Sequence, residues 1–110
     1  MSWEFVCTLG DVASGEFKRV TVDGIDLLVV GAENGISVIP PNCPHLEEPL
    51  ENGMCDGAVL TCMKHLWQWE ISSGKPVGLA EAPLKMYETK IVDQSVYVFI
   101  EEELIYEYGE

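Results

Sequence analysis

Short runs of apolar and β-branched residues recur along the chain, and turn signals separate them. Eight such runs are predicted to form strands: residues 3–9, 16–22, 25–30, 36–40, 58–62, 66–71, 85–91 and 95–100. The "DG" pair at 23–24 and "VDQ" at 92–94 predict tight turns. One helical turn fits within 9–15, and no longer window has a helical period. The pattern therefore predicts an all-β domain of antiparallel sheets.

Two stretches break this alternation of strands and turns. Residues 41–57, "PNCPHLEEPLENGMCDG", and residues 72–83, "SSGKPVGLAEAP", are rich in proline, glycine and polar residues. Such composition predicts irregular loops, and loops on a β scaffold commonly carry function. The charged C-terminal end, 101–110, is predicted to be solvated and frayed.

The length and charge of the chain limit its number of domains and the kinds of partner that it can bind. At 110 residues it is long enough for one domain, and 19 acids against 6 Lys+Arg give a net charge of −13. Nucleic acid is excluded as a partner, because phosphate binding needs clustered cations, whereas basic protein surfaces would be attracted. No apolar run approaches the ~20 residues of a membrane span, and no signal peptide is evident. We therefore expect a cytoplasmic protein.

Both histidines and half of the four cysteines fall in one pattern. It reads Cys43-x-His45, sixteen residues, then Cys62-x2-His65. A single cysteine or histidine is usually a packed core residue, but two such pairs in two loops indicate a ligand set. Structural zinc takes Cys2His2, although like ligands are then usually neighbours. One cysteine and one histidine from each loop also suit a binuclear iron–sulfur centre with two thiolates and two imidazoles.

The segments around these pairs resemble the Rieske ferredoxin family. The similarity is strongest in "CPHLEEPL" and "GAVLTCMKHLWQWEISSGK", and it continues through "FVCTLGDVASGE" and "LKMYETKIVDQSVYVFI". The resemblance implies a Rieske-type fold for 1–110, in which a cluster-binding loop subdomain is inserted in a β base. The inserted part would span about 41–76, and the base about 1–40 and 77–110.

The same resemblance implies one [2Fe-2S] Rieske cluster and assigns its ligands. Cys43 and Cys62 would hold the inner iron, and His45 and His65 would hold the outer iron at the solvent-facing loop tips. The chain would then be a one-electron carrier rather than an enzyme. Because both histidines of the chain would be cluster ligands, none is left for the 2-His-1-carboxylate iron site of an oxygenase.

Departures from another Rieske branch predict a low reduction potential. Rieske proteins of respiratory and photosynthetic complexes have a disulfide cysteine in each loop, at positions that correspond here to Glu48 and Lys64. That branch usually has Gly-Ser after the second histidine, where this chain has Leu66 and Trp67. Fewer hydroxyl donors, and the negative charges of Glu47 and Glu48, disfavour the added electron.

The "CPHLEE" and "HLW" segments look most like the ferredoxins of toluene-type aromatic monooxygenases. This implies an NADH-dependent flavin/iron–sulfur reductase as electron donor and a diiron hydroxylase as acceptor. Both partners would bind the same face of a monomeric ferredoxin. One alternative is the ferredoxin of a Rieske aromatic-ring dioxygenase, and a more distant one is a structural Cys2His2 zinc module.

The remaining notable residues are predicted to have structural roles. Cys7 is expected to be a buried thiol in the first strand, and Cys55 a free thiol. Trp67 and Trp69 alternate along one strand and should pack in the core on one face. Three loop glycines are expected to have positive φ: Gly53, Gly57 and Gly74.

Overall fold

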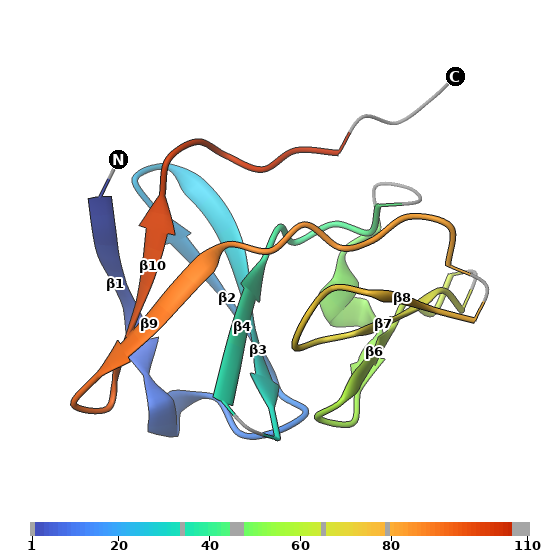
Figure 1. Cartoon of the computed structure of the whole chain (residues 1–110), viewed down its shortest axis with the longest axis horizontal. Helices are drawn as coiled ribbons and strands as arrows, with labels where there is room; N and C mark the ends of the chain where they lie inside the picture. The colour runs from blue at the N-terminus through green and yellow to red at the C-terminus, as the bar shows by residue number, and fades with distance from the viewer. Residues whose placement is uncertain (1, 34, 45–47, 65, 79, 107–110) are drawn as a thin grey trace.

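The computed structural model describes residues 2–33, 35–44, 48–64, 66–78 and 80–106, and its fold is the predicted antiparallel all-β architecture (Figure 1). The first sheet has the order β1 (Ser2–Thr8), β10 (Ser95–Ile100), β9 (Glu88–Val92). The second is β2 (Phe17–Val22), β3 (Ile25–Ala32), β4 (Gly35–Ile39). The third is β5 (Met54–Cys55), β6 (Val59–Thr61), β7 (Gln68–Glu70), β8 (Pro76–Val77). Two single 3-10 turns are also present, η1 (Leu9–Asp11) and η2 (Leu50–Asn52).

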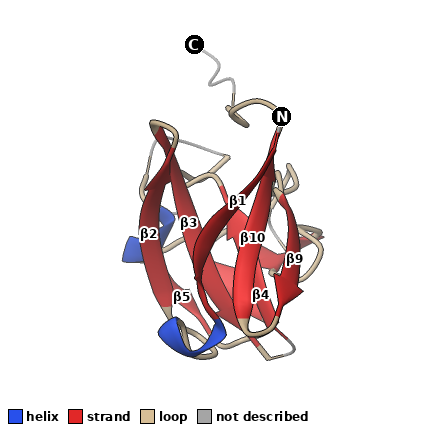
Figure 2. Cartoon of the chain, turned by 90° about the vertical axis from the view of Figure 1, so that its left-hand side faces the viewer, coloured by secondary structure: helices blue, strands red, loops and turns tan. Residues whose placement is uncertain are grey.

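The three sheets are arranged so that the second lies between the other two (Figure 1). Figure 2 views the molecule from the side of the first sheet, with β1, β10 and β9 standing beside β2 and β3. The described residues include no helix with the length and hydropathy of a bilayer span.

Strand β3 separates two hydrophobic cores. Leu27 and Val29 face the first, and Leu28 and Val30 face the second, because successive side chains of a strand point to opposite faces. All four are completely buried, which explains why this strand reads as a continuous apolar run. The rest of the first core is Val6, Cys7, Val12, Val38, Tyr87, Val96, Val98 and Ile100. The rest of the second is Ile39, Cys43, Leu50, Leu60, Cys62, Trp69, Ile71 and Leu84.

The two predicted tight turns are confirmed. Asp23 and Gly24 have φ of 53° and 79°, which is the backbone of a type I′ hairpin turn. Asp93 and Gln94 form the turn between β9 and β10 with φ of 49° and 74°. These turns set the registers Val22↔Ile25 and Val92↔Ser95.

All eight predicted strands are present, seven of them with shifted ends and one, β10, with the predicted bounds, and two others were missed. The largest shift is in β9, which begins at Glu88 rather than at residue 85. The missed strands, β5 and β8, contain two residues each and lie within the stretches predicted to be irregular. Strands this short have no alternation to detect, and only their pairing to β6 and β7 defines them.

The prediction of a solvated or frayed C-terminal end holds in part: residues 101–103 and 105 are exposed, but the segment is anchored at two points. Tyr106 is 9% exposed, and its hydroxyl accepts a hydrogen bond from the Lys85 amide at 2.8 Å. The Leu104 amide donates to the Tyr87 hydroxyl, also at 2.8 Å. The two tyrosine hydroxyls thus hold a segment whose charge alone suggested a solvated tail, and the last four residues of the chain lie outside the described part.

Mutations on the two faces of β3 should have different effects on the metal centre. Leu27→Ala and Leu28→Ala each remove a fully buried side chain, so each should lower the free energy of unfolding by roughly 2–5 kcal/mol. Only Leu28→Ala opens a cavity in the core that contains Cys43 and Cys62, so it alone should speed the loss of the visible absorbance of bound metal under native conditions. Equal rates of loss in the two variants would contradict this division.

Candidate metal centre

Two loops bring Cys43 and Cys62 to the same core. The first follows β4, and the second joins β6 to β7. Each cysteine amide closes its own loop with a hydrogen bond to the carbonyl five residues later: Cys43 to Glu48 at 3.0 Å, and Cys62 to Trp67 at 2.8 Å. The two loops are therefore closed by the same type of backbone hydrogen bond, although their sequences differ.

Further backbone contacts fix each loop. In the first loop, the Leu50 amide donates to the Pro41 carbonyl at 2.8 Å, beside an antiparallel bridge between Asn42 and Pro49. In the second, the Leu66 amide donates to the Cys62 carbonyl at 2.8 Å. This turn holds Leu66 at φ 59°, in the left-handed region.

Both thiols are withdrawn from water. Cys43 is 0% and Cys62 2% exposed, and both belong to the second hydrophobic core. His45 and His65 lie outside the described residues, and within the described part no group of three or more Cys, His, Asp or Glu side chains is assembled. Two buried thiols from different loops fit a metal that takes thiolate ligands in a site shielded from solvent.

No disulfide joins the four cysteines, all of which the structure describes. Cys7 is 2% exposed in the first core and Cys55 is half-buried, as predicted for a buried and a free thiol. Burial raises the pKa of both thiols, which keeps them protonated and weakly reactive. Glu48 and Lys64 stand at the positions where another Rieske branch would have its two disulfide cysteines, so no disulfide can join the two loops there.

Residues 2–88 match the family model described as the Rieske [2Fe-2S] domain. The chain belongs to the Rieske [2Fe-2S] domain family. It therefore carries a [2Fe-2S] cluster, as predicted, rather than a structural zinc. The cluster, when bound, accepts and donates one electron.

Relatives of this Rieske chain are ferredoxin components of oxygenase systems. It is 45% identical over 111 residues to the methanesulfonate monooxygenase ferredoxin subunit of Methylosulfonomonas methylovora, covering 100% of this chain and 90% of the relative. It is 28% identical over 87 residues to the alkene monooxygenase ferredoxin component of Xanthobacter autotrophicus, covering 78% and 71%. These components are electron carriers rather than enzymes, and so is this chain.

A solved structure has the same fold. It is the complex of reduced oxygenase and oxidized ferredoxin in carbazole 1,9a-dioxygenase, matched with a TM-score of 0.79 and 28% identity over 94% of this chain and 97% of that chain. The predicted Rieske-type all-β fold is thereby confirmed.

The tryptophans of the Rieske domain pack as predicted. Trp69 is completely buried in the second core, and its indole N–H donates to the Ala82 carbonyl at 2.8 Å. Trp67 packs against the same core, with its ring edge-on to Trp69 at 6.2 Å between centroids. The pair supports the core below the cysteine loops and ties it to the segment after β8.

Two of the three glycine predictions are correct. Gly57 and Gly74 have φ of 97° and 78°. Gly53 instead has φ −91°, so the prediction of a left-handed backbone is wrong there. A Cβ at this position would lie 2.0 Å from the Thr61 carbonyl oxygen, so glycine is needed for the close approach of η2 to β6.

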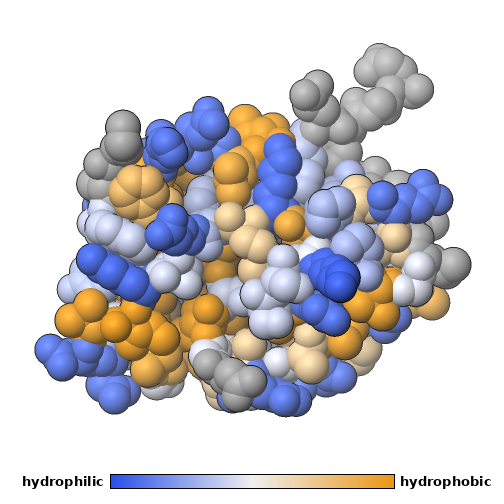
Figure 3. Space-filling view, in the orientation of Figure 1, coloured by the Kyte–Doolittle hydropathy of each residue, from blue (hydrophilic) through white to orange (hydrophobic). Residues whose placement is uncertain are grey.

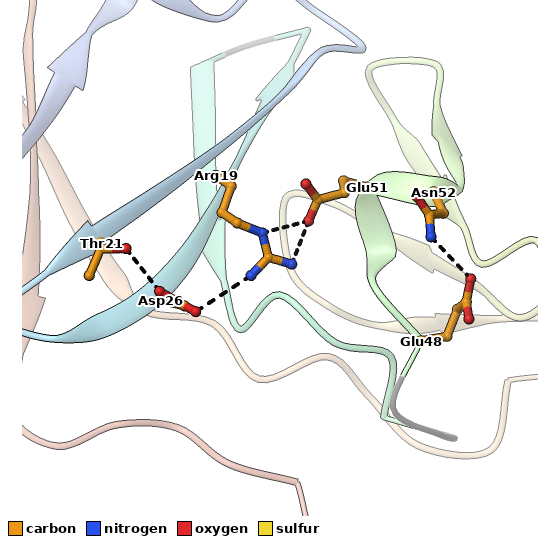
Figure 4. A network of polar contacts seen from close by, with 6 residues as sticks. All are labelled: Arg19, Thr21, Asp26, Glu48, Glu51 and Asn52. Carbon is orange, nitrogen blue, oxygen red and sulfur yellow. Dashed lines mark hydrogen bonds and ion pairs between the residues drawn. The ribbon is translucent and has the colours of Figure 1, made fainter.

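An ion pair that the sequence did not suggest ties η2, which follows the Cys43 loop, to strand β2 (Figure 4). Arg19 of β2, the only arginine of the chain, contacts the Glu51 carboxylate in η2 at 2.8 Å from Nε and 2.6 Å from Nη2. Glu51 thereby raises the pKa of the Arg19 guanidinium. Asp26 contacts the same guanidinium at 3.6 Å and accepts a hydrogen bond from Thr21 at 2.8 Å.

The same corner holds one of the acids expected to affect the cluster. The Asn52 amide donates to the Glu48 carboxylate at 3.4 Å (Figure 4). The Glu48 carbonyl also accepts a hydrogen bond from the Cys43 amide. Glu47, the second of these acids, lies outside the described residues. The carboxylate of Glu48 is thus restrained near the loop that carries the buried thiol.

Arg19 and Glu51 should be energetically coupled. In a cycle of Arg19→Gln, Glu51→Gln and the double variant, we expect a coupling of about 0.5–1 kcal/mol in the free energy of unfolding, since both side chains are about one-third exposed. High salt should reduce it. Asp26→Asn is the matched control, and its longer contact should couple more weakly to Arg19. Strictly additive effects of the Arg19 and Glu51 changes would disprove the tie.

Proposed function

We propose that the chain is the ferredoxin of a bacterial monooxygenase system. It receives single electrons from an NADH-dependent flavin/iron–sulfur reductase and delivers them to the terminal oxygenase. The observation that carries this proposal is the 45% identity, over the whole chain, to a monooxygenase ferredoxin subunit. The net charge of −13 favours a monomer that docks on basic surfaces.

The proposed cluster ligands are Cys43 and Cys62 for the inner iron and His45 and His65 for the outer iron. The complete burial of the two thiols supports their inner position. The described neighbours of the second histidine, in contrast, are exposed, which supports an outer position for the imidazoles. An imidazole at the solvent boundary shortens the path of an electron to a bound partner.

The proposed division of the domain follows the two cores. The cluster-binding part, about 41–76, contains both ligand loops and nearly all of the third sheet, which ends at Val77. The base, about 1–40 and 77–110, contributes the other two sheets. Support comes from β3, whose second face packs against the core that includes both thiols.

For the oxygenase, we propose first an enzyme that acts on a small sulfonate. The support is the methanesulfonate monooxygenase relative, at 45% identity. The second candidate is the diiron hydroxylase of a toluene-type aromatic monooxygenase, which the "CPHLEE" and "HLW" segments favour. A Rieske dioxygenase is the remaining alternative, since a ferredoxin–oxygenase complex of that type includes a chain with this fold.

Reconstitution tests the function and the substrate together. The ferredoxin is combined with the purified reductase and oxygenase of a methanesulfonate monooxygenase, or with those of a toluene monooxygenase, and product formation from methanesulfonate or toluene is measured with NADH as donor. We expect oxygenation of methanesulfonate only when all three components are present. Turnover that does not require the ferredoxin would contradict the carrier role, and product from toluene alone would favour the second candidate.

Replacing the proposed histidine ligands tests the outer iron site. His45→Cys combined with His65→Cys should keep a [2Fe-2S] cluster and lower its reduction potential, because two thiolates add negative charge to the cluster. Protein-film voltammetry measures the shift. Cys55→Ser, a change of a cysteine outside the ligand set, is the control and should leave the potential unchanged. If the double variant also keeps the wild-type potential, the histidines are not ligands.

A further inference from the structure

Leu66 occupies a backbone conformation that is unfavourable for leucine. Its φ is 59°, in the left-handed region where the Cβ of an L-residue is crowded. The hydrogen bonds around Cys62 impose this conformation, since its carbonyl accepts the Leu66 amide and its amide donates to the Trp67 carbonyl, each at 2.8 Å. Glycine would meet the same requirement without the steric cost.

Nothing in the described part of the chain compensates this cost through burial of the Leu66 side chain. The side chain is 56% exposed and belongs to neither hydrophobic core. The other non-glycine residues with positive φ are polar and lie in hairpin turns: Asp23, Asp93 and Gln94. Aspartate tolerates this conformation better, so Leu66 is the one apolar side chain, among the described residues, that is held in it.

Leu66 has an apolar neighbour at the same loop tip. Met63 is 51% exposed, and Lys64 follows it and is exposed as well. We call Met63, Lys64 and Leu66 the docking tip. On the face drawn in Figure 3, apolar groups form separate patches among hydrophilic ones. Other large apolar side chains, such as Phe5 and Ile91 of the first sheet, are also exposed, but among the described residues only Met63 and Leu66 lie in the loop of a buried proposed ligand.

We infer that the docking tip inserts Leu66 and Met63 into an apolar recess on the terminal oxygenase. Burial in the complex would then repay the conformational cost that the free protein bears. Because the chain has a net charge of −13, the recess should be bordered by basic side chains, with one acceptor for Lys64. The inference rests on the proposed function, and the solved ferredoxin–oxygenase complex of this fold supports an oxygenase as the occupant.

Three variants of the cluster-loaded ferredoxin test the inference. Leu66→Gly removes the side chain and the steric cost, and Leu66→Met keeps an apolar side chain. Gln94→Gly is the matched control, because it also relieves a positive φ (74°) but lies in the β9–β10 turn, far from the third sheet (Figure 1). The probe is the purified oxygenase component of a methanesulfonate monooxygenase, and calorimetry measures its affinity for each ferredoxin.

We expect Leu66→Gly to weaken binding about tenfold or more, while its melting temperature stays the same or rises. Leu66→Met and Gln94→Gly should bind within about threefold of wild type. Unchanged affinity of Leu66→Gly would overturn the inference. So would a lower melting temperature, which would show that Leu66 stabilises the free protein, or a shifted reduction potential with unchanged affinity. If none of the ferredoxins, including wild type and Gln94→Gly, binds the oxygenase, the proposed function itself fails.

Discussion

The structure depends on one strand being buried on both faces. Leu27 and Val29 of β3 pack into the first hydrophobic core, while Leu28 and Val30 pack into the second core, which contains Cys43 and Cys62. Because a strand alternates its side chains, a shift of one residue in register would exchange the two sets. The register of β3 between β2 and β4 therefore fixes how the loop-bearing sheet is placed on the base.

The conformations of the two cysteine loops are stabilised by three kinds of interaction, which differ in how far they are buried. Their thiols are buried in the second core, their cysteine amides close each loop, and the Arg19–Glu51 pair fastens the first loop from outside. Only the outermost of these is solvent-exposed enough to be weakened by salt. An electron carrier benefits from this arrangement, because the surroundings of the two buried thiols stay fixed while only surface contacts change.

Much of this organisation was predictable from the sequence, because local patterns encode it. Alternating residues revealed the strands, "DG" revealed a hairpin, and the paired Cys/His spacing led to the family. Contacts between distant segments were not predictable. The Arg19–Glu51 pair joins residues 32 positions apart, and Gly53 is required by the Thr61 carbonyl rather than by its own φ. The docking of Tyr106 likewise depends on Lys85, which no local pattern connects to the C-terminal end.

The central claim is that two cysteines and two histidines hold one [2Fe-2S] cluster in this chain. Electron paramagnetic resonance of the dithionite-reduced protein, with iron and acid-labile sulfide measured on the same sample, tests it most directly. The account predicts two irons and two sulfides per chain and the anisotropic spectrum of a Rieske centre. A colourless protein with one zinc and no sulfide, or a reduced cluster with the spectrum of an all-cysteine centre, would contradict it.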